Sequence, residues 1–156
     1  MKCRLIAVTG KEAAWVTAAC ADYLARLPRD YAIELHLIKA PPRTGVDVAR
    51  LQAREAELIR AKIGTDSRLI TLDERGQRLS SREFAAAWQR WREGGRNLAF
   101  VIGGADGLTP ELLRAADFCL SLSDLTLPHS LARVLLLEQC YRAATINIGH
   151  PYHLDG

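Results

Sequence analysis

Three segments of this chain carry the groups that could do chemistry. The first, Leu122–Ser130, reads Leu-Ser-Asp-Leu-Thr-Leu-Pro-His-Ser, and the second is the glycine-rich Gly103–Gly107. The third is His150–His153, with the sequence His-Pro-Tyr-His. Backbone N–H and C=O groups in the first two segments suit a small polar ligand, and histidine and tyrosine suit proton transfer. We expect the three segments to form one site.

The glycine segment follows an apolar run and has the sequence Gly103-Gly104-x-x-Gly107. Glycines after a buried strand let the backbone approach a ligand and expose its N–H groups. The segment is therefore either a nucleotide or nucleoside pocket or a tight turn before a helix. It differs from G-x-G-x-x-G and lacks the lysine and Ser/Thr of a P-loop. A Rossmann dinucleotide site is disfavoured for that reason.

Leucines alternate with polar residues in Leu122–Leu127. Leucine side chains can pack on the faces of a flat ring while backbone groups read its nitrogen pattern, as adenine requires. The alternative is a connecting loop whose leucines belong to the core. The helix that follows carries Glu138 and Arg142 four residues apart, which fits either a surface ion pair or a functional pair.

Other chemical sites find less support. His150 and His153 lack partners at metal-ligand spacing, so no metal site is expected. The chain has no G-x-S-x-G nucleophile motif. Trp88 and Trp91 could stack on RNA bases, but their helical spacing beside Phe84 favours the core.

The elements that must position these segments alternate between strands and helices. This pattern predicts an α/β fold with a mostly parallel sheet flanked by helices on both faces. Ligands bind such sheets beyond the carboxyl ends of the strands, and the three candidate ends are Leu72-Asp73, Gly103-Gly104 and Leu122–Leu127. Strands are expected at 2–8, 33–38, 68–72, 98–102 and 118–122, with a turn at 73–76. Helices are expected at 15–27, at 48–63, from the Ser80–Glu83 capping box to Gly94, from Thr109-Pro110 onward, and at 130–145. Trp15 is among the apolar positions of the first helix, and the core residues expected in the last are Leu131, Val134, Leu135 and Tyr141.

Composition limits the class of protein. At 156 residues, with 49% hydrophobic residues and a formal charge of +3, the chain fits one globular domain for which RNA is a permitted partner. The four cysteines form no C-x-x-C and two lie in apolar runs, so we expect reduced core thiols in a cytoplasmic protein. We expect no signal peptide and no membrane segment.

A specific resemblance adds to these patterns. It is carried by Leu122–His129, Arg133, Glu138-Gln139, Tyr141–Ala143 and Pro151–His153. Earlier positions agree with it: Val8, Trp15, Tyr23-Leu24, Thr71–Asp73, Ile102–Gly104 and Gly107-Leu108. Over its whole length the chain resembles the RlmH family, the 23S rRNA pseudouridine N3-methyltransferases of the SPOUT class.

The resemblance implies a single SPOUT methyltransferase domain over residues 1–156, with a C-terminal trefoil knot. It also implies a homodimer, S-adenosylmethionine as methyl donor, and 23S rRNA of the assembled ribosome as substrate. The tail of one subunit could then face the cofactor pocket of the other. The residues that it assigns to the cofactor are Leu72, Gly103, Leu122, Ser123, Asp124, Leu125, Thr126 and Leu127, and those that it places around the target nucleotide are His129, Glu138, Arg142, Tyr152 and His153.

One position departs from the family. Its members usually have a basic residue directly after Tyr-His, where this chain has Leu154. Either another basic residue compensates, such as Arg133 or Arg142, or rRNA binding is weaker. The departure leaves room for the alternative of a non-catalytic ribosome-binding module that keeps the fold. An oxidoreductase is disfavoured by the glycine pattern.

Overall fold

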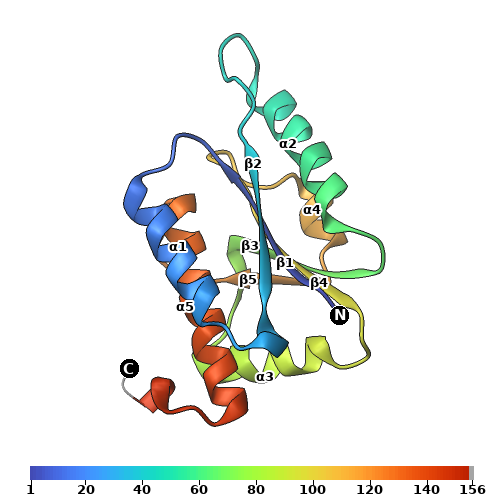
Figure 1. Cartoon of the computed structure of the whole chain (residues 1–156). Helices are drawn as coiled ribbons and strands as arrows, with labels where there is room; N and C mark the ends of the chain where they lie inside the picture. Colours follow the sequence, from blue (N-terminus) through green and yellow to red (C-terminus); the bar gives the residue numbers. More distant parts are fainter. Residues whose placement is uncertain (155–156) are drawn as a thin grey trace.

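The computed structural model describes residues 1–154, which are built around one five-stranded sheet (Figure 1). Every pair of neighbouring strands is parallel, in the order β2-β1-β4-β3-β5. This confirms the predicted α/β fold and its parallel sheet. The strands are β1 (Cys3–Thr9), β2 (Ile33–Lys39), β3 (Ser67–Arg78), β4 (Asn97–Ile102) and β5 (Phe118–Ser121).

Helices cover both faces of the sheet, which gives three layers. Helices α1, α3 and α5 pack on one face and α2 and α4 on the other, as Figure 1 shows. The helices are α1 (Ala14–Arg26), α2 (Val48–Ile63), α3 (Ser81–Arg92), α4 (Pro110–Ala115) and α5 (His129–Ile148), with short 3-10 turns η1 (Arg29–Tyr31) and η2 (Pro151–Leu154). None of the helices in residues 1–154 has the length and apolar character needed to span a membrane.

Local sequence signals set several helix ends as predicted. The Ser80 hydroxyl accepts a hydrogen bond from the Glu83 N–H at 3.1 Å and caps α3. Thr109 caps α4 in the same way, ahead of Pro110 at the first helical position. Gly64 ends α2 with a φ of 83°, a conformation that costs glycine little.

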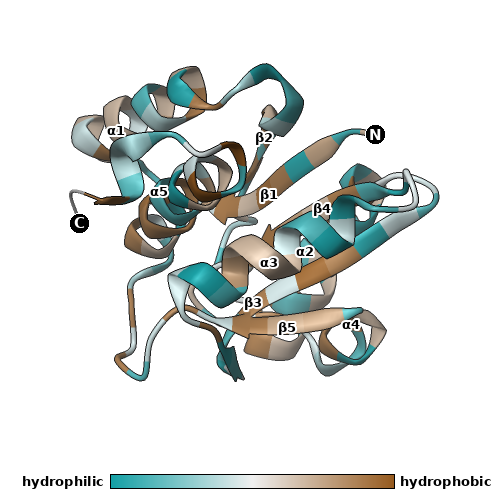
Figure 2. Cartoon of the chain, turned by 90° about the horizontal axis from the view of Figure 1, so that it is seen from below, coloured by the Kyte–Doolittle hydropathy of each residue, from teal (hydrophilic) through white to brown (hydrophobic). Residues whose placement is uncertain are grey.

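An aromatic cluster fills the core between α3 and the sheet. Phe84, Trp88, Trp91 and Phe100 are buried, and their rings meet mostly edge to face. The prediction that these tryptophans belong to the core is therefore confirmed. The hydrophobic stretches of the strands lie between the two helix layers (Figure 2). Three of the four free cysteines are also buried there: Cys3, Cys20 and Cys140.

The turn expected at residues 73–76 is wrong, because β3 continues to Arg78. A register irregularity lies between Leu72 and Gln77, and both residues pair with Leu120 of β5. Residues 73–76 therefore lie between two stretches of β3 that pair with the end of β5. At Gly76 the two backbones approach so closely that a Cβ would lie 2.7 Å from the Cys119 carbonyl oxygen.

Helical periodicity also misplaced some core residues. Trp15, in the first turn of α1, is 58% exposed, while Val16 and Cys20 take the buried side. Leu135 of α5 is exposed, whereas Leu136, Leu137 and Cys140 are fully buried. The reason is that α5 packs against α1, α3 and the sheet, so its buried side is wide and is selected by its neighbours.

We predict that Gly76→Ala destabilises the fold by about 1–3 kcal/mol, because the added methyl group would overlap the β5 backbone. Urea unfolding measures the change. Gly10→Ala is the control, since nothing lies within 4 Å of a Cβ there and its φ is not positive. Equal stability of the two variants would contradict the close approach of β3 and β5.

Candidate functional site

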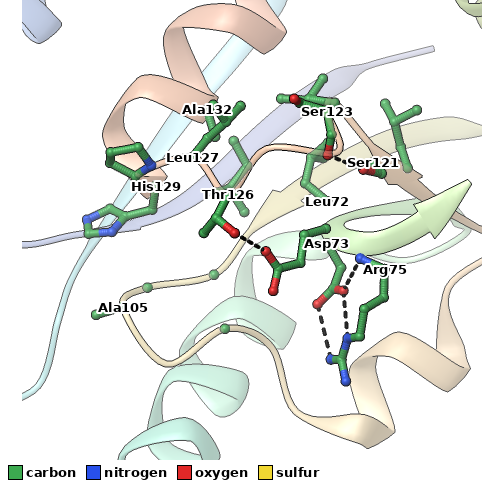
Figure 3. A pocket seen from close by; sticks show the side chains of 18 of the residues that line it. Leu72, Asp73, Arg75, Ala105, Ser121, Ser123, Thr126, Leu127, His129 and Ala132 are labelled. Carbon is green, nitrogen blue, oxygen red and sulfur yellow. Dashed lines mark hydrogen bonds and ion pairs between the residues drawn. The ribbon is translucent and has the colours of Figure 1, made fainter. Parts of the chain in front are cut away.

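A pocket of about 530 Å³ opens at the carboxyl ends of β3, β4 and β5 (Figure 3). Its walls come from residues 72–75 of β3, the Gly103–Gly107 loop after β4, and, from the end of β5 and the loop that follows it, residues 120–123 and 125–129. We call residues 103–107 the glycine loop and 122–128 the site loop. A pocket of this size accommodates a nucleoside-sized ligand.

The walls combine apolar side chains with carboxylates. Leu72, Ile102, Leu122 and Leu127 offer surfaces on which a flat ring can pack. The charged residues that line the pocket are Asp73, Glu74, Arg75 and Asp106, so acidic groups outnumber basic ones. The pocket therefore favours a ligand that joins an apolar ring to a positively charged group.

Short hydrogen bonds fix the conformation of the site loop. The Ser121 hydroxyl donates to the Ser123 carbonyl oxygen at 2.9 Å, and the Ser123 hydroxyl accepts from the Leu125 N–H at 2.9 Å. The Thr126 hydroxyl donates to Glu74 Oε2 at 2.8 Å, which ties the loop to β3 (Figure 3). The continuation of β3 thus supports the site loop along its length.

The glycine loop is held from the other side of the pocket. Arg43 makes two hydrogen bonds to the Asp106 carboxylate, at 2.7 and 3.1 Å, and Gln52 donates to the Asp106 carbonyl oxygen at 2.6 Å. A Cβ on Gly103 would lie 2.9 Å from the Gly107 carbonyl carbon, so this position is closely packed. Gly107 has a φ of 76°, which favours glycine.

Two of the wall carboxylates are held ionised. Burial raises the pKa of Asp73, but hydrogen bonds from Arg75 outweigh burial and leave the pKa below its usual value. The Arg43 guanidinium lowers the pKa of Asp106. The negative charge of the pocket is therefore present throughout the neutral pH range.

A second polar cluster joins the tail to the middle of α5. Arg142 donates to Glu138 Oε1 at 2.8 and 3.0 Å, and the Tyr152 hydroxyl donates to the same oxygen at 3.2 Å. The Arg142 guanidinium also lies 5.0 Å from the centre of the Tyr152 ring. The Glu138–Arg142 pair is mostly buried, so it is more than a solvated surface pair.

The tail cluster and the pocket lie apart within one chain. His129, the first residue of α5, lines the pocket, while η2 follows the far end of this 20-residue helix (Figure 1). The tail folds back along α5, however, so that the Tyr152 hydroxyl contacts Glu138, nine residues or about 14 Å along the helix from His129. The expectation that the three segments form one site is wrong for a single chain, because neither Glu138 nor the tail residues line the pocket.

The pocket contains most, but not all, of the predicted cofactor residues. Asp124 does not line it; its side chain is 75% exposed and pairs with Arg78 at 2.5 Å. Of the residues expected around the target nucleotide, His129 lines the pocket, and Glu138, Arg142, Tyr152 and His153 do not. The predicted cofactor residues that line it are Leu72, Gly103, Leu122, Ser123, Leu125, Thr126 and Leu127.

The sequence placed Asp73 at a strand end that could bind a ligand and Asp106 in the glycine loop, but the acidic wall that they form with Glu74 was not predicted. Three carboxylates near the ends of predicted strands were a usable signal. Arg133 cannot replace the missing basic tail residue, because it is buried and forms an ion pair with Glu12.

Within residues 1–154 no group of three or more His, Cys, Asp and Glu side chains is arranged to hold a metal ion.

Comparisons with known proteins agree with this geometry. The family described as "Predicted SPOUT methyltransferase" matches residues 1–153. The chain is 49% identical to the Ribosomal RNA large subunit methyltransferase H of Methylibium petroleiphilum, covering 99% of this chain and 100% of the relative. Relatives of the same name from Paracidovorax citrulli and Dechloromonas aromatica are 44% and 43% identical, covering 99% and 100% of this chain and all of each relative.

A solved structure shares the fold. It is described as a probable methylase family protein from Haemophilus influenzae, with a TM-score of 0.57 and 17% sequence identity. The match covers 96% of this chain and 69% of the other. The C-terminal trefoil knot is consistent with this likeness and stays a prediction.

We predict that one tyrosine of this chain titrates late. Burial, followed by the negative charge of Glu138, raises the pKa of Tyr152 to about 12. Between pH 10 and 12 the unfolded chain loses this proton more readily than the folded one, so the free energy of unfolding falls as pH rises through that range. Absorbance titration near 295 nm detects the late tyrosine.

Tyr152→Phe should remove the late step and flatten the pH dependence of stability in the same range. Tyr31→Phe is the control, because Tyr31 contacts Trp88 and Gln89 rather than Glu138. A late step that persists in Tyr152→Phe would contradict the Glu138–Tyr152 contact.

Proposed function

The chain belongs to the SPOUT methyltransferase family, and on that premise we propose that it methylates N3 of a pseudouridine in 23S rRNA of the assembled ribosome. The chain is an rRNA methyltransferase. We further propose S-adenosylmethionine as the methyl donor and the cytoplasm, where ribosomes are, as the place of action. The observation that carries the proposal is the pocket at the ends of β3, β4 and β5, with apolar walls and ionised carboxylates.

The pocket fits such a donor. Leu72, Leu122 and Leu127 present apolar surface for the adenine ring, and the backbone of the site loop presents hydrogen-bonding groups for its edge. Asp73 and Glu74 supply negative charge for the positive end of the donor. Gly103 carries no side chain, and a Cβ there would collide with the backbone of Gly107 and displace the glycine loop that forms this wall of the pocket.

When bound, the donor supplies a methyl group activated by a sulfonium charge, so the protein acts mainly by alignment. The site loop, held by Glu74 and by its own serine hydrogen bonds, orients one side of the transfer. N3 of the base carries a proton that must leave. His129 lines the pocket, and in this proposal it is a candidate to accept that proton.

The tail cluster completes the site from a second subunit in this proposal. Tyr152 is a protonated phenol at neutral pH and therefore serves as a hydrogen-bond donor rather than a base. Arg142, held by Glu138, can stabilise negative charge that develops on the uracil oxygens. Glu138 and Arg142 lie nine and thirteen residues after His129, about 14 and 20 Å along α5, and none of these groups lines the pocket of its own chain, so a homodimer would bring pocket and tail together.

The alternative function, a non-catalytic ribosome-binding module, is favoured only by Leu154. The exposed Leu154 removes a cation from the tail, and Arg133 is too buried to replace it. We propose that the shape of the assembled ribosome supplies selectivity in place of that charge.

Mass spectrometry of 23S rRNA from a deletion strain tests the function directly: no lost methyl group on a pseudouridine would refute it. Equal methylation rates on free rRNA and intact ribosomes would refute the role of ribosome shape.

We predict that Gly103→Val weakens binding of S-adenosylmethionine at least tenfold, because the side chain would displace the glycine loop. Isothermal titration calorimetry measures the affinity, and gel filtration checks that the oligomeric state is unchanged. Gly10→Val is the control, with free space around its Cβ. If Gly103→Val keeps its affinity, the loop is only a turn; if the wild type does not bind, the methyltransferase reading fails.

The shared site makes a second prediction, from mixing two inactive variants. Gly103→Val impairs the pocket, and a double change of Tyr152 and His153 to alanine impairs the tail. Mixed dimers then contain one site with an intact pocket and an intact tail. Equal mixing should restore about a quarter of the wild-type methylation of ribosomes, since half of the dimers are mixed and each has one working site of two.

Methyl incorporation is measured before and after subunit exchange. Each variant alone is the control and should stay inactive. If pocket and tail of the same chain formed the site, mixed dimers would contain no working site. Activity that stays at background after exchange therefore refutes the shared arrangement.

A further inference from the structure

A buried carboxyl group lies directly behind the glycine loop. Glu55, on the inner side of α2, is only 5% exposed. A Cβ on Gly104 would lie 2.8 Å from Glu55 Oε1 and 3.1 Å from Oε2, so the carboxyl group occupies the place of a side chain at that position. Gly104 itself lines the pocket. A single layer of backbone therefore separates Glu55 from the ligand space.

Within residues 1–154, Glu55 has no partner that would explain its burial. Its Oε2 is inaccessible to solvent and has no hydrogen-bond partner among the described residues. No ion pair within 4 Å involves Glu55 in that part of the chain, and the adjacent Gln52 donates to the Asp106 carbonyl oxygen instead. A buried, unpaired carboxylate is costly, and buried polar groups of this kind require an explanation.

The charges around Glu55 do not make up for this cost. Asp106 in the glycine loop and Arg43 in the β2–α2 loop are the charged groups that face it, and they pair with each other. Burial, and then the charge of Asp106, raises the pKa of Glu55, while Arg43 acts in the opposite direction. Across the pocket lie Asp73, Glu74, Arg75 and His129. Asp73 and Asp106 are already ionised at neutral pH, so they have no proton to give.

We propose that Glu55 is a positioning residue of the donor pocket: its carboxyl group supports the glycine loop from behind and gives up its proton to solvent when a positively charged methyl donor occupies the pocket. The inference rests on the proposed function, because the positive charge comes from the donor. S-adenosylmethionine carries a sulfonium and an ammonium group against one carboxylate. Its arrival on the other side of Gly104 favours the ionised form of Glu55. Binding and proton release are thereby linked.

Glu55→Gln tests this inference, since it keeps the shape and removes the charge. In the empty protein, Glu55 costs stability above its ordinary pKa of 4.5, because the folded state holds the proton more tightly than the unfolded state. Glu55→Gln should therefore melt at a higher temperature than the wild type at pH 7, and the difference should vanish as pH falls below about 4.5. The matched control is Glu57→Gln, two residues further along α2 and exposed.

Affinity should change in the opposite direction. Calorimetry of S-adenosylmethionine binding in acetate and in MES, which buffer at mildly acidic pH and differ in ionisation enthalpy, counts the protons released. The wild type should release protons at mildly acidic pH, and Glu55→Gln should release fewer and bind about tenfold more weakly. S-adenosylhomocysteine, which lacks the sulfonium charge, should show a smaller difference between the two proteins. A residue with a structural role alone would not distinguish these two ligands.

The outcomes separate the inference from the function on which it rests. If the wild type does not bind S-adenosylmethionine, the proposed function fails and the inference with it. If it binds with no proton release, or if Glu55→Gln matches the wild type in affinity and proton count, the function stands and the inference is overturned. The wild-type proton count needs no variant, so a misfolded Glu55→Gln protein would not remove the test.

Discussion

Parallel pairing of β3 with both β4 and β5 is the constraint on which the site depends. Parallel strands end at the same edge of a sheet, so the segments after Leu72, Ile102 and Ser121 must meet there although they are far apart in the sequence. The bulge in β3 adds a second element, since residues 73–76 lie unpaired with β5 between Leu72 and Gln77, which both pair with Leu120. Glu74 in that bulge then holds Thr126 of the site loop. Pocket shape and pocket charge thus have one common origin in strand register.

Charge is distributed unevenly around the pocket. Asp73 and Asp106 are ionised because each accepts hydrogen bonds from an arginine, whereas Glu55 is buried behind the glycine loop with no such partner. The first two give the empty pocket a permanent negative character. The third is an acid whose ionisation depends on what the pocket holds. A positively charged methyl donor matches both the permanent charge of the pocket and the ionisable Glu55. Without such a ligand, the buried carboxyl group of Glu55 would only reduce stability.

The position of the tail cluster along α5 is the observation that supports the proposed homodimer. His129 begins the helix at the pocket, and the Glu138–Arg142–Tyr152 cluster lies further along it and beyond its end. None of the groups in this cluster lines the pocket, so one chain has a donor pocket without the tail residues. The proposed homodimer resolves this separation and explains why a chain of 156 residues can address so large a substrate.

Much of this protein follows from its sequence. Strand and helix alternation determined the parallel sheet, the caps at Ser80 and Thr109 determined two helix starts, and the motif at 122–129 with the tail determined the family. These signals are local, or they survive as short motifs. The tertiary structure decided the rest: the bulge that replaced the turn at 73–76, the exposure of Trp15, the burial of Arg133, and the separation of pocket from tail. Each of these depends on which backbone or helix face a distant segment supplies. Glu55 shows the same principle, because its role follows from its contact with Gly104, from which 48 residues separate it in the sequence.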